Sequence, residues 1–156
     1  MPLRGFAVLI MILAMYYFAY SSNMSLEHMR RLCGWHFQVL GAASLEGYKV
    51  GPDLRGYLTI QPEDKGKVFG VLYTVDQFCL DAMDKFEGHP NVFERKQIRV
   101  KDMSNNALDA WVYGEHPEAF GGEMVNAEHL KRVIYAAEQQ HLPKEWIKFL
   151  ESFRTA

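Results

Sequence analysis

Hydrophobic and polar positions near the start of the chain predict a strand, a tight loop and a helix in direct succession. Residues 16–20 are apolar and mostly aromatic, which is typical of a buried strand. Ser21, Ser22 and Asn23 interrupt this run, and their short polar side chains favour a tight loop. Ser25 is a good helix N-cap, and the partly apolar segment after it predicts a short helix. Because a helix N-terminus presents unpaired N–H groups, such a junction is suited to binding an anion.

Later segments predict a sheet interrupted by one helix, followed by helices at the end of the chain. After Asp76, apolar residues recur at three- and four-residue spacing, which predicts a helix that ends at Gly88. The polar stretch 61–66 contains Pro62 and Gly66 and predicts a charged turn. Several strands with an inserted helix, then helices, indicate an α+β fold. The predicted strands cover 35–50 (with turns at Gly41 and Gly47), 57–60, 67–75, 92–101 and 108–113, and the last two helices begin near Asn126 and Pro143.

Composition narrows the classes of function. The chain has 156 residues, of which 49% are hydrophobic, and this is enough for one globular domain with a core. The formal net charge of −2 indicates no basic face, so we expect no nucleic-acid partner. Cys33 and Cys79 lie far apart without Cys-x-x-Cys spacing, so we expect buried free thiols, with neither a metal site nor a disulfide framework. The six histidines show no ligand spacing and are expected to be surface or structural groups.

The first residues resemble a targeting segment. Residues 3–15 contain one positive charge and an apolar run, as in a signal peptide, but the run is shorter than the roughly 20 residues of a membrane span. The segment could be a signal peptide, a membrane anchor, or a dispensable extension with the true start at Met11 or Met15. We expect an extension over 1–14 and a single domain over 15–156. The expected location is cytoplasmic, with export or membrane tethering through residues 3–15 as the alternative.

Two blocks of sequence resemble one family of enzymes. Residues 17–24 read Tyr-Phe-Ala-Tyr-Ser-Ser-Asn-Met, and this resembles the opening signature of the γ-glutamylcyclotransferase family, usually Tyr-Phe-Ala-Tyr-Gly-Ser-Asn. The segment 70–100 is also similar to the family, with a strand, a helix, the Glu87-Gly88 pair and another strand in the same order. The resemblance covers nearly the whole chain. It departs at Ser21, where the family usually has glycine, a residue that lets the backbone approach the substrate without a Cβ in the way.

The resemblance implies a small mixed β-barrel flanked by α-helices. It also implies a γ-glutamylcyclotransferase reaction, in which the γ-glutamyl group of a γ-glutamyl amino acid or amine closes to 5-oxoproline and releases the amine. Glu87 is implied as the general acid/base, without a metal or a cofactor. The residues themselves agree, because a carboxylate at a helix C-terminus is disfavoured and desolvation would raise its pKa toward neutrality. The implied substrate-binding residues are Tyr17, Phe18, Ala19, Tyr20, Ser21, Ser22, Asn23 and Tyr113.

Alternative functions stay open at this point. Ser21 in place of glycine is compatible with a non-catalytic small-molecule binding module on the same fold. A membrane-tethered interaction protein would depend on residues 3–15 alone. The expected partner is a small γ-glutamyl compound, with no nucleic acid and no membrane, and the protein is expected to be a monomer or a homodimer. Arg95 either fixes the catalytic loop or pairs with Glu94 or Asp109, and a structural duty is the expectation.

Overall fold

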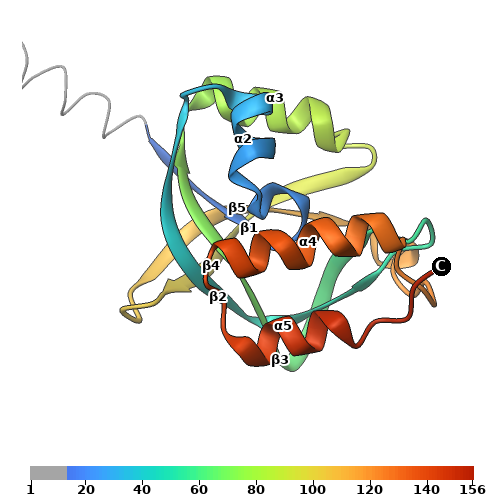
Figure 1. Cartoon of the computed structure of the whole chain (residues 1–156). Helices are drawn as coiled ribbons and strands as arrows, with labels where there is room; N and C mark the ends of the chain where they lie inside the picture. Colours follow the sequence, from blue (N-terminus) through green and yellow to red (C-terminus); the bar gives the residue numbers. More distant parts are fainter. Residues whose placement is uncertain (1–13) are drawn as a thin grey trace, which may run out of the picture.

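The structure is a computed structural model, and it describes residues 14–156. The predicted extension over 1–14 lies outside the described residues except for Ala14. The described part contains five strands, four α-helices and two short 3₁₀ helices (Figure 1). In chain order they are β1 (Met15–Ala19), η1 (Ser22–Met24), α2 (Leu26–Cys33), β2 (Phe37–Pro52), β3 (Leu58–Val75), α3 (Gln77–Glu87), β4 (Phe93–Asp102), β5 (Ala107–Glu115), η2 (Pro117–Ala119), α4 (Ala127–Gln139) and α5 (Lys144–Glu151).

The strands close into a barrel in the order β1-β3-β2-β4-β5. Most neighbouring strands are antiparallel, whereas β1 and β5 run parallel where Tyr17 lies opposite Trp111, so the barrel is mixed. α2 and α3 lie together at one end of the barrel, and α4 crosses its side next to η1, with α5 beside it (Figure 1). This mixed barrel with flanking helices is the α+β fold that the family resemblance implied.

β2 and β3 form one long hairpin, and this corrects the prediction of a charged turn over 61–66. β3 continues without interruption through this segment and pairs Pro62 with Tyr48 of β2. The side chains there are mostly exposed, so the polar sequence marks a solvent-facing length of strand. The turns predicted at Gly41 and Gly47 are wrong as well. Both glycines lie within β2 next to shifts in register, with positive φ values of 120° and 84° that glycine tolerates.

β1 packs tightly against β3, and this packing positions the loop that follows it. The two strands pair along the whole length of β1, with Phe18 opposite Leu72. The Phe18 side chain is fully buried, and Gly70 of β3 leaves the space for it, since a Cβ on Gly70 would lie 2.7 Å from Phe18 Cζ. The close approach fixes where β1 ends and therefore where residues 20–23 begin.

A disulfide joins Cys33 and Cys79, and this corrects the expectation of two free thiols. Cys33 ends α2 and Cys79 lies in the first turn of α3, and both are fully buried where the two helices pack together. The count of two cysteines does not reveal this contact, because it depends on the packing of residues 46 positions apart in the sequence. Since α2 follows the predicted substrate loop and α3 ends at Glu87, the bond links the two elements that flank the predicted site.

Candidate active site

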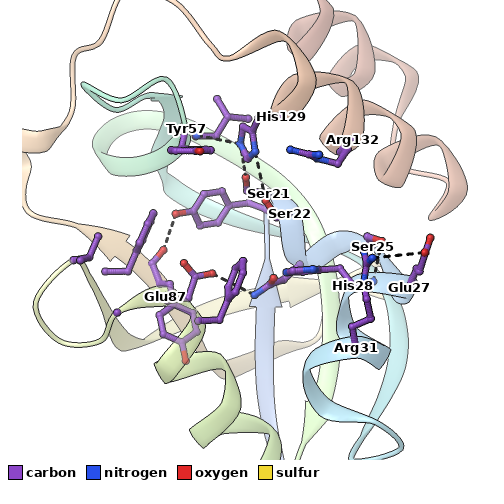
Figure 2. Close-up of a pocket in the computed structure, with 18 of the residues that line it drawn as sticks. Ser21, Ser22, Ser25, Glu27, His28, Arg31, Tyr57, Glu87, His129 and Arg132 are labelled. Carbon is purple, nitrogen blue, oxygen red and sulfur yellow. Dashed lines mark hydrogen bonds and ion pairs between the residues drawn. The ribbon is translucent and has the colours of Figure 1, made fainter.

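A pocket of about 1030 Å³ opens between the loop after β1, the C-terminal end of α3 and one side of α4 (Figure 2). It is lined by every site residue predicted from the sequence except Ala19. Ala19 is buried in the barrel core, with 2% of its surface exposed. The predicted residues that line the pocket are Tyr17, Phe18, Tyr20, Ser21, Ser22, Asn23, Glu87 and Tyr113. Their part in binding or catalysis stays a prediction.

Glu87 is the last residue of α3, and its carboxyl group lies in the wall of the pocket. Gly88 ends the helix in the left-handed conformation (φ 70°, ψ 35°), in agreement with the predicted helix end. Burial raises the pKa of Glu87 to about 7, while the charge of Arg55 and a hydrogen bond from Asn23 oppose the rise. The partial negative charge of the helix C-terminus acts in the same direction as burial. Near neutral pH this carboxyl group can therefore accept a proton and return it, as a general acid/base must.

Asn23 connects the loop to Glu87. Its Nδ2 donates to Glu87 Oε1 at 3.3 Å and to the Tyr17 hydroxyl at 2.8 Å. The Tyr73 hydroxyl donates to the backbone carbonyl of Asn23 at 2.8 Å. Asn23 is buried (3% exposed), yet its Oδ1 has no hydrogen-bond partner among the described residues. A buried acceptor without a partner is uncommon, so this oxygen is an unsatisfied polar atom beside Glu87.

His129 contacts both serines of the loop from α4. It lies in the first turn of this helix and is buried (4% exposed). Its Nε2 accepts from the Leu58 backbone N–H at 3.3 Å and lies 3.2 Å from Ser21 Oγ, while its Nδ1 lies 3.5 Å from Ser22 Oγ. Since Nε2 needs a lone pair to accept from Leu58, the imidazole is neutral and has its proton on Nδ1. Burial, together with the charge of Arg132, lowers the pKa of His129 to about 4, so the ring stays neutral near pH 7.

These contacts explain how the loop accommodates Ser21 where the family usually has glycine. The Ser21 hydroxyl lies next to the His129 ring, so the added polar group has a partner within the protein. Sequence reasoning treated His129 as one of six structural or surface histidines and missed this contact. The local signal is weak, because His129 merely follows the Asn126 N-cap by three residues, whereas Ser21 is 108 residues away.

A charged cluster after β2 places Arg55 beside the pocket, and it too was missed from the sequence. Asp53 is buried (1% exposed), and its Oδ1 accepts from the backbone N–H groups of Arg55 and Tyr57 at 2.8 and 3.0 Å. The Arg55 guanidinium contacts Asp53 Oδ2 at 3.0 Å and Glu115 Oε1 at 3.2 Å. Its charge favours the ionised form of Glu87 and lowers the pKa of that carboxyl group against the effect of burial. Arg55 is thus a fixed cation near the predicted base.

Tyr113 and Arg95 meet at Asp84 of α3. The Tyr113 hydroxyl donates to Asp84 Oδ1 at 2.6 Å, and Arg95 Nε donates to the same oxygen at 2.8 Å. The pairing of Arg95 with Glu94 or Asp109 is wrong, because Asp84 engages its guanidinium where β4 meets α3. Arg95 therefore has a structural duty, in that it ties β4 to the helix that ends at the predicted base.

Comparisons with known proteins give the family. Residues 17–138 match the family described as gamma-glutamyl cyclotransferase, AIG2-like. A segment of 59 residues is 36% identical to gamma-glutamylaminecyclotransferase A of Danio rerio, and the match covers 36% of this chain and 37% of that protein. A segment of 62 residues is 32% identical to a Methanocaldococcus jannaschii protein named for gamma-glutamylcyclotransferase activity, and it covers 40% of this chain and 51% of that protein. The chain thus spans about half or less of the length of these curated relatives.

Solved structures share the fold at low sequence identity. A gamma-glutamyl cyclotransferase superposes with a TM-score of 0.84, at 18% identity, over 92% of this chain and 89% of that chain. At this identity the superposition shows that the two proteins share a fold. The family match is separate evidence, and it covers most of the described residues. By that match, the chain belongs to the gamma-glutamyl cyclotransferase, AIG2-like family.

Proposed function

We propose that this protein is a γ-glutamylcyclotransferase that converts γ-glutamyl amino acids or amines to 5-oxoproline and the free amine, with Glu87 as general acid/base. The observation that supports this most is the Glu87 carboxyl group, which lies in the pocket at the family's Glu-Gly position and has its pKa raised to about 7 by burial. Asn23, from the family's signature loop, donates a hydrogen bond to it. A carboxyl group that titrates near neutrality suits a reaction in which one group takes up a proton and later gives it back.

The proposed reaction begins with the α-ammonium group of the substrate. The Glu87 carboxylate removes one proton, and the free amine attacks the γ-carbonyl carbon of the same molecule, so that a carbon–nitrogen bond closes a five-membered ring. The protonated Glu87 then returns its proton to the departing nitrogen, and the original amide bond breaks. The ring nitrogen gives up its second proton, and the released amine takes up that proton to become an ammonium group. The balance is one γ-glutamyl compound to one 5-oxoproline and one amine. Because ring closure is unimolecular, holding the γ-glutamyl group in a folded pose is a large part of the catalysis.

The loop residues have separate parts in this proposal. The buried Oδ1 of Asn23 has no hydrogen-bond partner among the described residues and would accept from the substrate ammonium group, which keeps the attacking nitrogen next to Glu87. Backbone N–H groups of residues 20–23 would donate to the oxyanion that develops on the γ-carbonyl oxygen or to the α-carboxylate. His129 steadies this loop through Ser21 and Ser22, so the donors keep their direction when substrate arrives.

Release of 5-oxoproline from a panel of γ-glutamyl amino acids and amines tests the proposal. We expect release by the wild type and by Glu123→Gln, a control on an exposed carboxylate outside the pocket, and none by folded Glu87→Gln. If folded wild type releases no 5-oxoproline from any compound, the enzyme proposal fails. The non-catalytic binding module is then the second candidate, and it predicts that the wild type and Glu87→Gln bind the same compounds equally.

The location of the protein is a separate matter. The sequence predicts the cytoplasm, with export or tethering through residues 3–15 as the alternative. Within residues 14–156, none of the helices combines the length and apolar character needed to cross a membrane. The disulfide between Cys33 and Cys79 supports export, because disulfides are rare in cytosolic proteins. Fractionation of the tagged full-length chain, with free thiols alkylated before lysis, tests this, and alkylated cysteines in a cytosolic fraction would favour the cytoplasm.

A further inference from the structure

We propose that the pocket has a second, cationic end, formed by His28, Arg31 and Arg132, that binds a carboxylate on the leaving group. The preferred substrates are then γ-glutamyl amino acids or peptides, and γ-glutamyl amines without a carboxylate are poor substrates. This inference rests on the proposed function, because it defines what the cyclisation releases.

The two arginines line the pocket from different helices. Arg31 belongs to α2 and Arg132 to α4, and both are exposed to solvent. Figure 2 shows them on the same side of the pocket as His28, away from Glu87. Neither guanidinium is held rigidly. Arg31 has Glu27 as a partner at 3.9 Å with both side chains mostly exposed, and no ion pair of Arg132 forms among residues 14–156. Exposed pairs of this kind are weak, so both groups can turn toward an anion.

His28 adds a polar atom that has no partner of its own. Its Nε2 is buried and makes no hydrogen bond to any residue that the structure describes, although the side chain lines the pocket. The ring is fixed edge-to-face on Phe86, with centroids 4.7 Å apart. Burial lowers the pKa of His28, and the positive charges of Arg31 and Arg132 lower it further. A neutral imidazole can donate one hydrogen bond from Nε2, and a carboxylate oxygen is a suitable acceptor.

The remaining charges on this side leave an excess of positive charge. Besides Glu27, the other pocket carboxylate in this region is Glu128, which lies 4.0 Å from Lys131. Glu27 and Glu128 offset Arg31 and Lys131. Arg132 and Lys85, which also lines the pocket, are the charges left over. An anion is therefore favoured here, and a leaving group with an additional ammonium would meet like charge, which is how a site rejects an unwanted partner.

The cationic end lies where the leaving group is expected. His28 contacts Phe86, the residue before Glu87, and Asn23 next to Glu87 belongs to the loop that leads into the His28 helix. A γ-glutamyl group held at Asn23 and Glu87 has its scissile amide there, and its leaving group extends past Phe86 toward His28. In an amino acid the carboxylate is separated from the departing nitrogen by a single carbon. Such a carboxylate therefore leaves the reacting centre on the side of the leaving group, where His28, Arg31 and Arg132 line the pocket.

The experiment compares γ-glutamylalanine with γ-glutamylalaninamide, which differ only in the charge of the leaving group. We expect wild type to have a kcat/KM at least about tenfold higher for the acid, the range of one charge-assisted hydrogen bond. Arg132→Gln is expected to lower kcat/KM about tenfold for the acid and less than about twofold for the amide. The matched control is Lys148→Gln on α5, which removes one positive charge from an exposed side chain outside the pocket and should leave the acid-to-amide ratio nearly unchanged.

Two results would overturn the inference. One is equal kcat/KM of wild type for the acid and the amide. The other is an equal loss for both substrates in Arg132→Gln, which would mean that the arginine binds the α-carboxylate of the γ-glutamyl group itself. If neither these two compounds nor any other of the panel yields 5-oxoproline, the proposed function fails, and calorimetric titration of the same two compounds decides the inference separately. Tighter binding of the acid that disappears in Arg132→Gln supports it, and equal binding contradicts it.

Discussion

Replacing Glu87 by glutamine should make the protein more stable at high pH while removing its activity. Burial raises the pKa of Glu87 from an ordinary value of 4.5 to about 7, against the opposing effects of Arg55 and Asn23. The folded protein therefore binds this proton more tightly than the unfolded chain does. Between pH 4.5 and pH 7 the folded state holds more protons than the unfolded state, and stability must fall as the pH rises through this window.

The size of the effect follows from the two pKa values. A difference from 4.5 to about 7, at about 1.4 kcal/mol for each tenfold change in proton affinity, corresponds to about 3 kcal/mol. This stabilisation is present below the unfolded pKa and is lost above the folded one. Glutamine stays neutral and keeps an oxygen that can accept from Asn23 Nδ2, so the variant avoids the loss. At pH 8 we expect Glu87→Gln to be more stable by up to about 3 kcal/mol, or up to about 10 °C in Tm, and to match wild type near pH 4.

Urea and thermal unfolding from pH 4 to pH 8.5 would measure this, with Glu123→Gln as the exposed control. Other groups titrate in the same range, among them Glu115, whose pKa burial raises to about 8 with a further rise from Asp53. They cancel in the difference between wild type and variant, because both proteins contain them. A difference that does not change with pH, or a variant less stable than wild type at pH 8, would show that Glu87 is not held near neutrality. The argument for its role as a general base would then be wrong.

The other predictions concern the contacts around the pocket. His129→Phe leaves the Leu58 N–H and both loop hydroxyls without the imidazole, so we expect a loss of about 2 kcal/mol in urea unfolding and a higher KM for γ-glutamyl substrates, and a retained KM would contradict the loop contact. Arg95→Met leaves the carboxylate of Asp84 without its cation in a half-buried site (18% and 19% exposed side chains) and should cost about 1–3 kcal/mol. Arg99→Met breaks a pair that is 67% and 60% exposed and should cost less than about 1 kcal/mol, so similar losses in the two variants would refute this ranking. Reduction of the Cys33–Cys79 disulfide, which spans 46 residues, should lower the free energy of unfolding by about 4 kcal/mol, and an unchanged urea midpoint in reductant would argue against the bond.

The parts of the site that the sequence predicted depend on short stretches of chain. The loop 20–23 lies between the buried strand β1 and the helix α2, which Ser25 caps. Residues next to the loop in the sequence therefore mark both of its ends. The same holds for Glu87, because Asp76 caps the start of its helix with a side-chain hydrogen bond and Gly88 ends it. Local spacing is enough to predict such elements, and the family resemblance implies a role for them that stays a prediction. The raised pKa of Glu87 was expected from its place at a helix end combined with desolvation, and burial is the main cause of the rise.

The parts that the sequence did not predict depend on contacts between distant segments. His129 meets Ser21 across 108 residues, and the disulfide joins helices 46 residues apart. The Arg55 guanidinium is held by Asp53, just after β2, and by Glu115 at the end of β5, and these two residues are 62 positions apart in the sequence. The segment 61–66 was mistaken for a turn because its polar residues suggested a loop, whereas an exposed length of strand has the same composition. A run of polar residues indicates that a segment is exposed to solvent, but an exposed segment can be either a strand or a turn.

Product balance on a single compound tests the central claim most directly. Wild type incubated with γ-glutamylalanine should form one 5-oxoproline for each alanine released, with no glutamate, and folded Glu87→Gln should form neither product. Glutamate in place of 5-oxoproline would mean that water, and not the substrate's own amine, attacks the γ-carbonyl. That result, or undiminished 5-oxoproline formation by Glu87→Gln, would contradict the account of this pocket as a cyclotransferase site built on Glu87.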